Sequence, residues 1–338
     1  YPSCKTKNRV KSQIENCCNN NPPPLMQHQI RSQLILPELW QFTKFGYLQA
    51  QKNWLPVSNN MQHKHIIITG ASSGLGLASA MALAQKGANL TLVVRNQTKG
   101  EEVKHMICQK TGNTKINLEI ADMSLMSDVL ALSQRLHQQQ RPIDVLINNA
   151  SLAPLTKQKT RDGFELQFGA NYLGHFLFTQ LLLDVLNEAG RARIVHTSSM
   201  MHWLGGVDFG SFHGDKFYDP IRAYAQSKLA ILLFSNELSR RLKKTKITSN
   251  TFHPGGTPQE IYFNLPRAAY LTVKPFLAAP EEGARTAVLL ATAPHLSDST
   301  GKYFSKGEQA LMSPRARNED LALKLYEVSA GLCQVEAL

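Results

Sequence analysis

From residue 64 onward, short apolar runs rich in β-branched residues alternate regularly with longer amphipathic segments. The runs have the length of strands and the segments the length of helices. We expect strands at His65–Thr69, Leu90–Val94, Ile116–Ile120, Asp144–Asn148, Arg193–Thr197, Ile247–Phe252 and Lys302–Phe304. We expect helices at Gly74–Lys86, Lys99–Lys110, Ser124–Gln139, within Gly163–Leu186 and at Arg222–Lys243. This alternation predicts an α/β fold, a doubly wound parallel sheet with helices on both faces.

The first 60 residues differ from this pattern. Residues 1–60 contain seven Lys and Arg residues against two acidic residues, and the stretch Asn19–Pro24 is rich in residues that break helices and strands. Such a composition predicts a basic, partly disordered extension. The apolar side chains of Leu34–Trp54 leave open a short helix that docks on the core or on a membrane surface. Residues 61–338 are expected to form the α/β domain, and Glu260–Pro280, which breaks the alternation, is a candidate lid.

Composition argues against several classes of protein. The net charge is +12, but no nucleic-acid recognition motif accompanies it, so we expect no nucleic-acid partner. The five cysteines lack metal-ligand spacing, so we expect no metal and favour a reducing, cytoplasmic location. No apolar run approaches the ~18 residues of a bilayer span. Because the chain begins at Tyr1, an upstream anchor or signal is left open.

A glycine-rich turn, Thr69–Gly76, joins the first predicted strand to the first predicted helix. The free backbone N–H groups and the dipole of a helix N-terminus favour an anion. Gly70 permits a tight turn, while Gly74 and Gly76 let the backbone approach a pyrophosphate. No Lys-Ser/Thr pair follows the last glycine, which excludes a Walker loop. The turn predicts a dinucleotide site made by Gly70, Ser72, Ser73, Gly74, Leu75 and Gly76. The alternative is a glycine-rich turn that binds no ligand.

The residue after the second predicted strand distinguishes two forms of dinucleotide. In dinucleotide-binding folds an acidic residue near this position binds the ribose 2′-hydroxyl. Here the strand is followed by Arg95, whose planar guanidinium suits a phosphate, and then by Asn96 and Lys99. We therefore expect NADP(H) rather than NAD(H), with these three residues near the 2′-phosphate. The alternative is an exposed arginine that ends a strand.

Two further strand ends fall on the same predicted edge of the sheet. Asp122 and Met123 follow the third strand, where an acid can accept a hydrogen bond from an adenine amino group or cap the next helix. Asn149 and Ala150 follow the fourth strand, at the carboxyl edge where such sheets bind ligands. All four residues are expected to contact the cofactor.

A tyrosine and a lysine one helical turn apart form a candidate acid–base pair. Tyr224 and Lys228 share one face of a predicted helix. About three pKa units, or roughly 4 kcal/mol, separate a free tyrosine from neutrality. An ammonium about 4 Å away supplies roughly that amount at an effective dielectric constant near ~20. The pair can therefore act as a general acid/base, although an isolated pair of this kind is usually a surface contact.

The order and spacing of these motifs resemble the short-chain dehydrogenase/reductase family, which has a Rossmann-like three-layer αβα fold. The matching residues are Thr69–Gly76, Asp122, Asn148–Ala150, Asn171, Ser199, Tyr224, Lys228 and Pro254–Gly255. The resemblance runs from about residue 62 to about residue 330. Within the family, Arg161–Thr179 and Phe234–Pro254 resemble the branch that includes retinol dehydrogenases, the WW-domain oxidoreductase and light-dependent protochlorophyllide reductases.

The resemblance implies catalytic roles. Tyr224 is the general acid/base, and Lys228 holds the nicotinamide ribose and lowers the pKa of the tyrosine. Ser199, rather than Ser198, orients the substrate oxygen, and a hydroxyl at a strand end can stabilise charge that develops there. Asn171 supports a water in a proton relay.

The resemblance also implies contacts near the nicotinamide and reveals departures. Pro254 and Gly255 lie by the nicotinamide, and Thr257 is expected to replace the usual threonine contact. Ser151 follows Asn-Asn-Ala where the family usually has glycine, and Pro258 alters the loop after Gly255.

These observations predict an NADP(H)-dependent oxidoreductase that transfers hydride between the nicotinamide and a hydrophobic alcohol or carbonyl compound. Apolar residues of the candidate lid predict the hydrophobic substrate and leave peripheral contact with a membrane open: Tyr262, Phe263, Leu265, Tyr270, Leu271 and Phe276. Family likeness leaves open a homodimer through the two long helices. The alternative function, favoured by Ser151 and the altered loop, is an NADP(H)-binding protein with little or no turnover that acts as a redox sensor or interaction partner.

Overall fold

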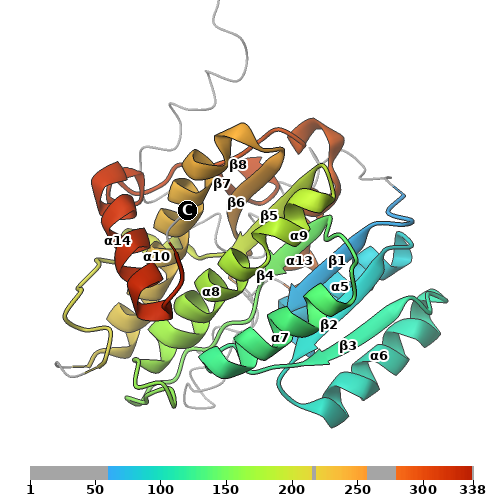
Figure 1. Cartoon of the computed structure of the whole chain (residues 1–338), viewed down its shortest axis with the longest axis horizontal. Helices are drawn as coiled ribbons and strands as arrows, with labels where there is room; N and C mark the ends of the chain where they lie inside the picture. The colour runs from blue at the N-terminus through green and yellow to red at the C-terminus, as the bar shows by residue number, and fades with distance from the viewer. Residues whose placement is uncertain (1–59, 215–217, 257–278, 337–338) are drawn as a thin grey trace, which may run out of the picture. The chain divides into compact units, whose positions relative to one another are not determined.

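The computed structural model describes residues 60–214, 218–256 and 279–336. Within these ranges one sheet has the strand order β3-β2-β1-β4-β5-β6-β7-β8 (Figure 1). The strands are β1 (His65–Thr69), β2 (Asn89–Val94), β3 (Ile116–Ile120), β4 (Val145–Asn148), β5 (Ala192–Thr197), β6 (Ile247–His253), β7 (Tyr303–Ser305) and β8 (Glu308–Gln309). All neighbours are parallel except β7 and β8. The predicted doubly wound α/β fold is confirmed.

Helices connect the strands and pack on the sheet. The α-helices are α5 (Gly74–Gln85), α6 (Gln97–Thr111), α7 (Met126–Gln138), α8 (Gly174–Leu181), α9 (Leu183–Glu188), α10 (Pro220–Arg241), α13 (Pro280–Thr292) and α14 (Glu319–Cys333). A π-helical turn, η1 (Phe168–Leu173), precedes α8. The 3₁₀ turns are η2 (Met200–Trp203), η3 (Leu242–Lys244), η5 (Pro294–Leu296) and η6 (Arg315–Arg317).

The central strand β1 shows how the three layers form. Every residue of β1 is buried, because the strand has helices on both faces. Ile67 belongs to the apolar layer that contains residues of α7, α8 and α10. Its neighbours Ile66 and Ile68 belong to the opposite layer, with residues of α5, α6 and α13. Successive side chains of a strand point to opposite faces, so alternate residues of β1 contribute to both cores.

The long helix predicted within Gly163–Leu186 is divided into η1, α8 and α9. Gly174, where α8 begins, packs against the loop after β3, and a Cβ atom there would overlap the carbonyl oxygen of Met123. A continuous amphipathic pattern predicts one helix, but this close approach of two backbones depends on the tertiary fold. A π-turn in such a helix is frequently associated with a functional site.

The sequence pattern did not predict α14, which packs beside α8 and α10 (Figure 1). Tyr326 of α14 is fully buried, and its ring centroid lies 5.2 Å from that of Phe176 and 6.1 Å from that of Phe234. The hydroxyls of Tyr172 and Ser329 lie 2.7 Å apart. The homodimer through the two long helices, left open by the sequence, stays a prediction, and α14 packs on α8 and α10 within the same chain.

Several expectations fall outside the described residues. They include the extension 1–60, apart from Asn60, and the candidate lid, apart from Ala279 and Pro280. Among the helices described, none combines the length and the apolar character that a membrane crossing requires.

Candidate active site

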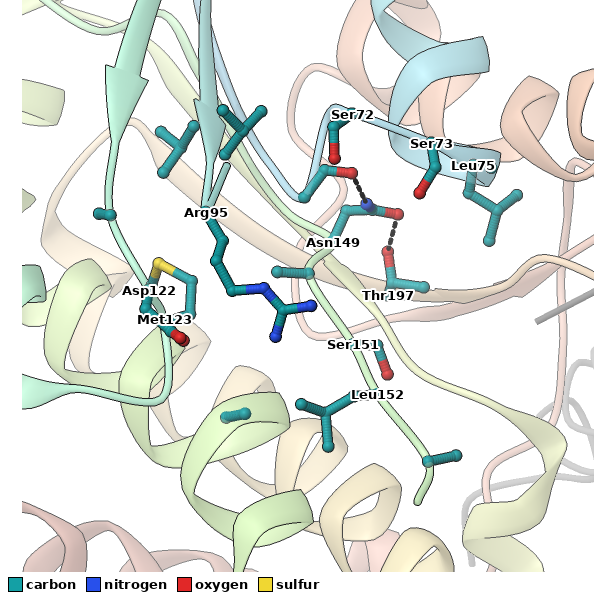
Figure 2. A pocket seen from close by; sticks show the side chains of 18 of the residues that line it. Ser72, Ser73, Leu75, Arg95, Asp122, Met123, Asn149, Ser151, Leu152 and Thr197 are labelled. Carbon is teal, nitrogen blue, oxygen red and sulfur yellow. Dashed lines mark hydrogen bonds between the residues drawn. The ribbon is translucent and has the colours of Figure 1, made fainter. Parts of the chain in front are cut away.

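A cleft of about 430 Å³ lies at the carboxyl ends of β1 to β5, where the strand order reverses between β1 and β4 (Figure 2). Sheets of this kind bind ligands at such a reversal. The cleft brings together the predicted residues Gly70, Ser72, Ser73, Gly74, Leu75, Arg95, Asp122, Met123, Asn149 and Ala150. It is also lined by Ser151 and by residues that no motif indicated: Val93, Val94, Leu152, Ala121, Ala153, Ala170, Thr197 and Pro280.

The N-terminus of α5 lies at the cleft and has no side-chain cap. Ser73 occupies the N-cap position, yet its hydroxyl makes no capping hydrogen bond. By contrast, Asn96, Asp219 and Asn318 each accept a hydrogen bond from a backbone N–H in the first turn of α6, α10 and α14. The first-turn donors of α5 remain for another acceptor, and a phosphate group fits this position.

Asn149 fixes the glycine turn against the end of β4. Its Nδ2 donates to the carbonyl oxygens of Thr69 at 3.0 Å and Gly70 at 3.5 Å, and its Oδ1 accepts from the Thr197 hydroxyl at 3.4 Å. Gly70 has a φ of +66°, which favours glycine. Gly76 does not line the cleft itself; it packs beneath the turn, where a Cβ atom would overlap the Gly70 carbonyl oxygen.

We expect Gly76→Ala to lower the free energy of unfolding by about 1–3 kcal/mol, because the added methyl group must displace the turn and the Asn149 amide. Nucleotide affinity should fall with it. Urea denaturation and a nucleotide titration measure the two effects. The matched control is Gly331→Ala on α14, where a Cβ atom meets nothing within 4 Å. Equal unfolding free energies for both variants would contradict the prediction.

Arg95 extends its guanidinium into the cleft, between the segment of Asp122 and Met123 and the segment of Ser151 (Figure 2). No described residue forms an ion pair with it. Arg95 follows the end of β2, and its guanidinium can contact an anionic group of a ligand in the cleft.

Three other residues predicted near the cofactor are also used by the fold. Asn96 caps α6 by accepting from the backbone N–H of Lys99 at 2.9 Å, and neither residue lines the cleft. Asp122 lines the cleft and also accepts from the backbone N–H of Ser124 at 2.9 Å. This hydrogen bond lies in the loop before α7, whose N-cap position is Leu125 and which has no side-chain cap, so Asp122 does not cap that helix, a role that the sequence had left open.

Tyr224 and Lys228 lie on the buried side of α10, with exposed fractions of 5% and 1%. Nζ of Lys228 lies 5.3 Å from the centroid of the Tyr224 ring. The ammonium donates to the carbonyl oxygen of Thr197 at 3.1 Å and to Oγ of Ser151 at 3.0 Å. Both acceptors line the cleft, so the ammonium lies directly behind its wall. Burial lowers the pKa of Lys228 to about 7, because desolvation penalises the charged form.

The two serines after β5 have different environments. Ser198 is fully buried and donates from Oγ to the carbonyl oxygen of Lys228 at 2.9 Å, which joins β5 to α10. Oγ of Ser199 accepts from the backbone N–H of Met201 at 3.2 Å. No described residue accepts the Ser199 hydroxyl proton, and Ser199 is not among the residues that line the cleft, so its contact with a substrate stays a prediction.

Asn171 ties η1 to the segment after β4. Its Oδ1 accepts from the backbone N–H of Leu152 at 2.8 Å, and its Nδ2 donates to the Leu152 carbonyl oxygen at 2.9 Å. Nδ2 also lies 3.2 Å from Oγ of Ser227, which donates to the carbonyl oxygen of Tyr224. The side chain thus connects the wall of the cleft with the helix that carries Tyr224.

His175 continues this network inside the protein. Oγ1 of Thr69 accepts from the backbone N–H groups of Asn149 and Ala150 at 2.9 and 3.0 Å. The Thr69 hydroxyl proton then has Nε2 of His175 as its acceptor, 2.8 Å away. Nδ1 of His175 must therefore carry the ring proton and donate to the carbonyl oxygen of Asn171 at 3.0 Å. Burial lowers the pKa of His175 to about 4, so the ring is neutral near neutral pH.

Pro254 and Gly255 follow β6 and are buried; neither lines the cleft. Gly255 has a φ of +87°, a conformation that favours glycine. Thr257, the last residue expected near the nicotinamide, lies outside the described residues.

Comparison with known proteins agrees with this arrangement. The family profile described as "short chain dehydrogenase" matches residues 64–265. This chain belongs to the short-chain dehydrogenase family. It is therefore an oxidoreductase of a family that uses NAD(P)(H).

The relatives of this dehydrogenase include retinol dehydrogenases. Human retinol dehydrogenase 11 is 38% identical over 271 residues, which are 80% of this chain and 85% of the relative. Mouse retinol dehydrogenase 13 is 35% identical over 315 residues, which are 89% of this chain and 94% of the relative. A crystal structure of an uncharacterized protein from Mycobacterium Paratuberculosis is 31% identical, with a TM-score of 0.68 and coverage of 83% of this chain and 97% of that chain.

The dehydrogenase has contributors to the cleft that its motifs did not indicate. Thr197 contributes its backbone carbonyl to Lys228 and its hydroxyl to Asn149, and its only sequence signal is its place at the end of a strand. Leu152 contributes backbone groups, which carry no sequence signal. Ser151 was visible as a departure from the family pattern, but its contact with Lys228 depends on the fold.

Proposed function

We propose that this chain is an NADP(H)-dependent dehydrogenase/reductase that acts on a hydrophobic alcohol or carbonyl compound, with Tyr224 as its general acid/base. The observation that carries the proposal is one cleft with an arginine at one strand end, which no described residue pairs, and a buried Tyr–Lys pair behind its inner wall. A cation suits the 2′-phosphate of NADP(H), and the Tyr–Lys pair suits proton transfer to or from a substrate oxygen.

The residues of the cleft fit a dinucleotide. The uncapped N-terminus of α5 would hold the pyrophosphate, Arg95 the 2′-phosphate, and Asp122 the adenine. The bound cofactor supplies or accepts the hydride. Hydrogen bonds of Asn149 and Thr69 join the glycine turn to the end of β4, so the fold itself holds the pyrophosphate site in shape.

Tyr224 would hold or release the proton on the substrate oxygen. The Lys228 ammonium lies 5.3 Å from the centroid of the Tyr224 ring and favours the phenolate electrostatically, because a nearby positive charge stabilises an anion. Ser199 would orient the substrate oxygen through its free hydroxyl proton. Asn171 would act by fixing α10 against the cleft wall and by supporting the proton relay.

We expect Arg95→Asp to weaken NADPH binding by about a hundredfold and to narrow or reverse the preference over NADH, because a carboxylate repels the 2′-phosphate. Dissociation constants for both cofactors, from quenching of nucleotide fluorescence, measure this. The matched control is Lys115→Asp, which makes the same charge change on an exposed residue before β3, at the amino edge of the sheet. An unchanged NADPH/NADH ratio in Arg95→Asp would refute the assignment.

The retinol dehydrogenase relatives and the predicted apolar lid support a hydrophobic substrate. The direct test is NADPH oxidation by the purified chain across a panel of retinoid, steroid and lipid aldehydes and ketones, with Tyr224→Phe beside it. Turnover that the variant loses would support the proposal.

A second candidate is an NADP(H)-binding protein with little turnover. The observation that favours it is the hydrogen bond from Lys228 to Ser151, which takes one of the ammonium donors. Tight NADPH binding without turnover on any member of the panel would favour this candidate.

A further inference from the structure

Ser151 stands where the family usually has a glycine, and it is the only cleft-lining side chain that the described hydrogen bonds join to Lys228. We propose that Ser151 is a positioning residue of the acid–base pair, whose hydroxyl holds the Lys228 ammonium in place and charged beside Tyr224. This inference rests on the acid–base roles proposed above for Tyr224 and Lys228.

The backbone on both sides of Ser151 is fixed by hydrogen bonds. The N–H of Ala150 donates to Oγ1 of Thr69 at 3.0 Å. The N–H and carbonyl of Leu152 are both paired with the Asn171 side chain, at 2.8 and 2.9 Å. The Cα of Ser151 therefore has little freedom. Its hydroxyl is presented to Lys228 by the fold rather than by a mobile loop.

The Lys228 ammonium depends on its protein acceptors. An ammonium has three N–H donors, and because this residue is only 1% exposed, it depends mainly on protein acceptors. The Thr197 carbonyl and the Ser151 hydroxyl accept two of these hydrogen bonds at 3.1 and 3.0 Å. Burial lowers the pKa of Lys228 to about 7, and an acceptor bonded to the charged form opposes that effect. Without the hydroxyl the ammonium would lose its proton at a lower pH.

Among the described residues, the two histidines on which the Lys228 charge acts do not titrate in the relevant range. His175 on α8 and His253 on β6 are the histidines on which its charge acts, and Tyr224 lies on its own helix. Burial lowers the pKa of His175 to about 4 and that of His253 to about 3. Both rings stay neutral at higher pH, so a titration above about pH 5 reports on Lys228 and Tyr224.

The test is a direct titration of Lys228 in the whole chain without cofactor or substrate. Protein labelled with ¹³C at lysine Cε is titrated by NMR, and the Lys228 resonance is identified by its loss in Lys228→Met. Ser151→Ala removes the hydroxyl and keeps Cβ, Ser151→Gly removes both, and Ser151→Thr keeps the hydroxyl. A hydrogen bond to a charged group is worth about 1.5 kcal/mol or more, which corresponds to about one pKa unit.

We expect the Lys228 pKa to fall by about one unit in both Ser151→Ala and Ser151→Gly, and to return to the wild-type value in Ser151→Thr. A wild-type pKa in Ser151→Ala would overturn the inference. A change confined to Ser151→Gly would also overturn it, because it would show that Ser151 acts only through the space that its Cβ fills.

The pH profile of alcohol oxidation with NADP⁺ tests the consequence for Tyr224. A less charged Lys228 stabilises the phenolate less, so the limb that reports deprotonation of Tyr224 should move to higher pH in Ser151→Ala and Ser151→Gly. Ser151→Thr should keep the wild-type limb. Absence of turnover in the wild type would refute the proposed function, while the NMR titration would still decide whether Ser151 holds Lys228 charged.

Discussion

Replacing Tyr224 with phenylalanine should lower kcat by about a thousandfold, within the range that removal of a general acid/base produces. The change deletes one oxygen and leaves the ring, which is 5% exposed, in its packing on α10. The fold and the phosphate-binding end of the cleft should therefore persist. Steady-state kinetics and a separate NADPH binding measurement distinguish loss of proton transfer from loss of cofactor.

Tyr218→Phe is the matched control for this prediction. Tyr218 accepts from Nε2 of Gln167 at 2.9 Å and donates to the Pro154 carbonyl oxygen at 3.2 Å, so its hydroxyl serves the fold near the start of α10. Its loss should cost about 1 kcal/mol of stability with a minor effect on kcat. If Tyr224→Phe retained a turnover similar to that of Tyr218→Phe, Tyr224 would not be the acid/base.

Replacing Lys228 with methionine should abolish turnover and stabilise the fold. Burial lowers the pKa of Lys228 from 10.5 to about 7. At 1.36 kcal/mol per unit, burying the charge costs about 4 to 5 kcal/mol below the folded-state pKa. Loss of the hydrogen bonds to Ser151 and the Thr197 carbonyl offsets about 1 to 3 kcal/mol of that gain. A net increase of about 2 kcal/mol in the free energy of unfolding is expected near neutral pH.

The sign of this effect depends on pH. Between about pH 7 and pH 10.5 the unfolded chain binds more protons at Lys228 than the folded chain, so wild-type stability from this group rises with pH. The excess in the free energy of unfolding of Lys228→Met over wild type should be largest below about pH 7 and should shrink as the pH approaches 10.5. Urea denaturation at several pH values measures it, with Lys243→Met at an exposed lysine as the control. A methionine variant less stable than wild type at neutral pH would contradict the prediction. A stability loss accepted for activity is a common property of functional sites.

The predicted strands differ from the observed ones by no more than a single residue at each end. Part of this agreement has a simple cause, because a strand buried on both faces, such as β1, favours a run of apolar residues. The sequence also predicted that Tyr224 and Lys228 lie together, because residues four apart on a helix are neighbours whatever the helix packs against. The glycine turn followed from its place between a strand and a helix.

Other features had no local signal. Gly174 lets α8 approach the Met123 carbonyl, and the apolar residues of α14 fit a site made by α8 and α10. The contacts of the Asn171 side chain with the backbone of Leu152 were not predicted, and its expected role in a proton relay stays a prediction. Every residue has the same backbone groups, so a sequence motif cannot indicate which backbone groups a side chain will contact.

The sequence by itself determined the strands of the sheet other than β8, the edge at which the cleft forms, and many of the residues that line it. These depend on periodicity and on the order of strands and helices, which are local or nearly local properties. Only the tertiary structure decided that Ser151, 77 residues before Lys228, would accept from its ammonium, and that α14 would cover α8 and α10. Such contacts join segments that are distant in sequence, and their geometry is fixed only when the two layers pack on the sheet.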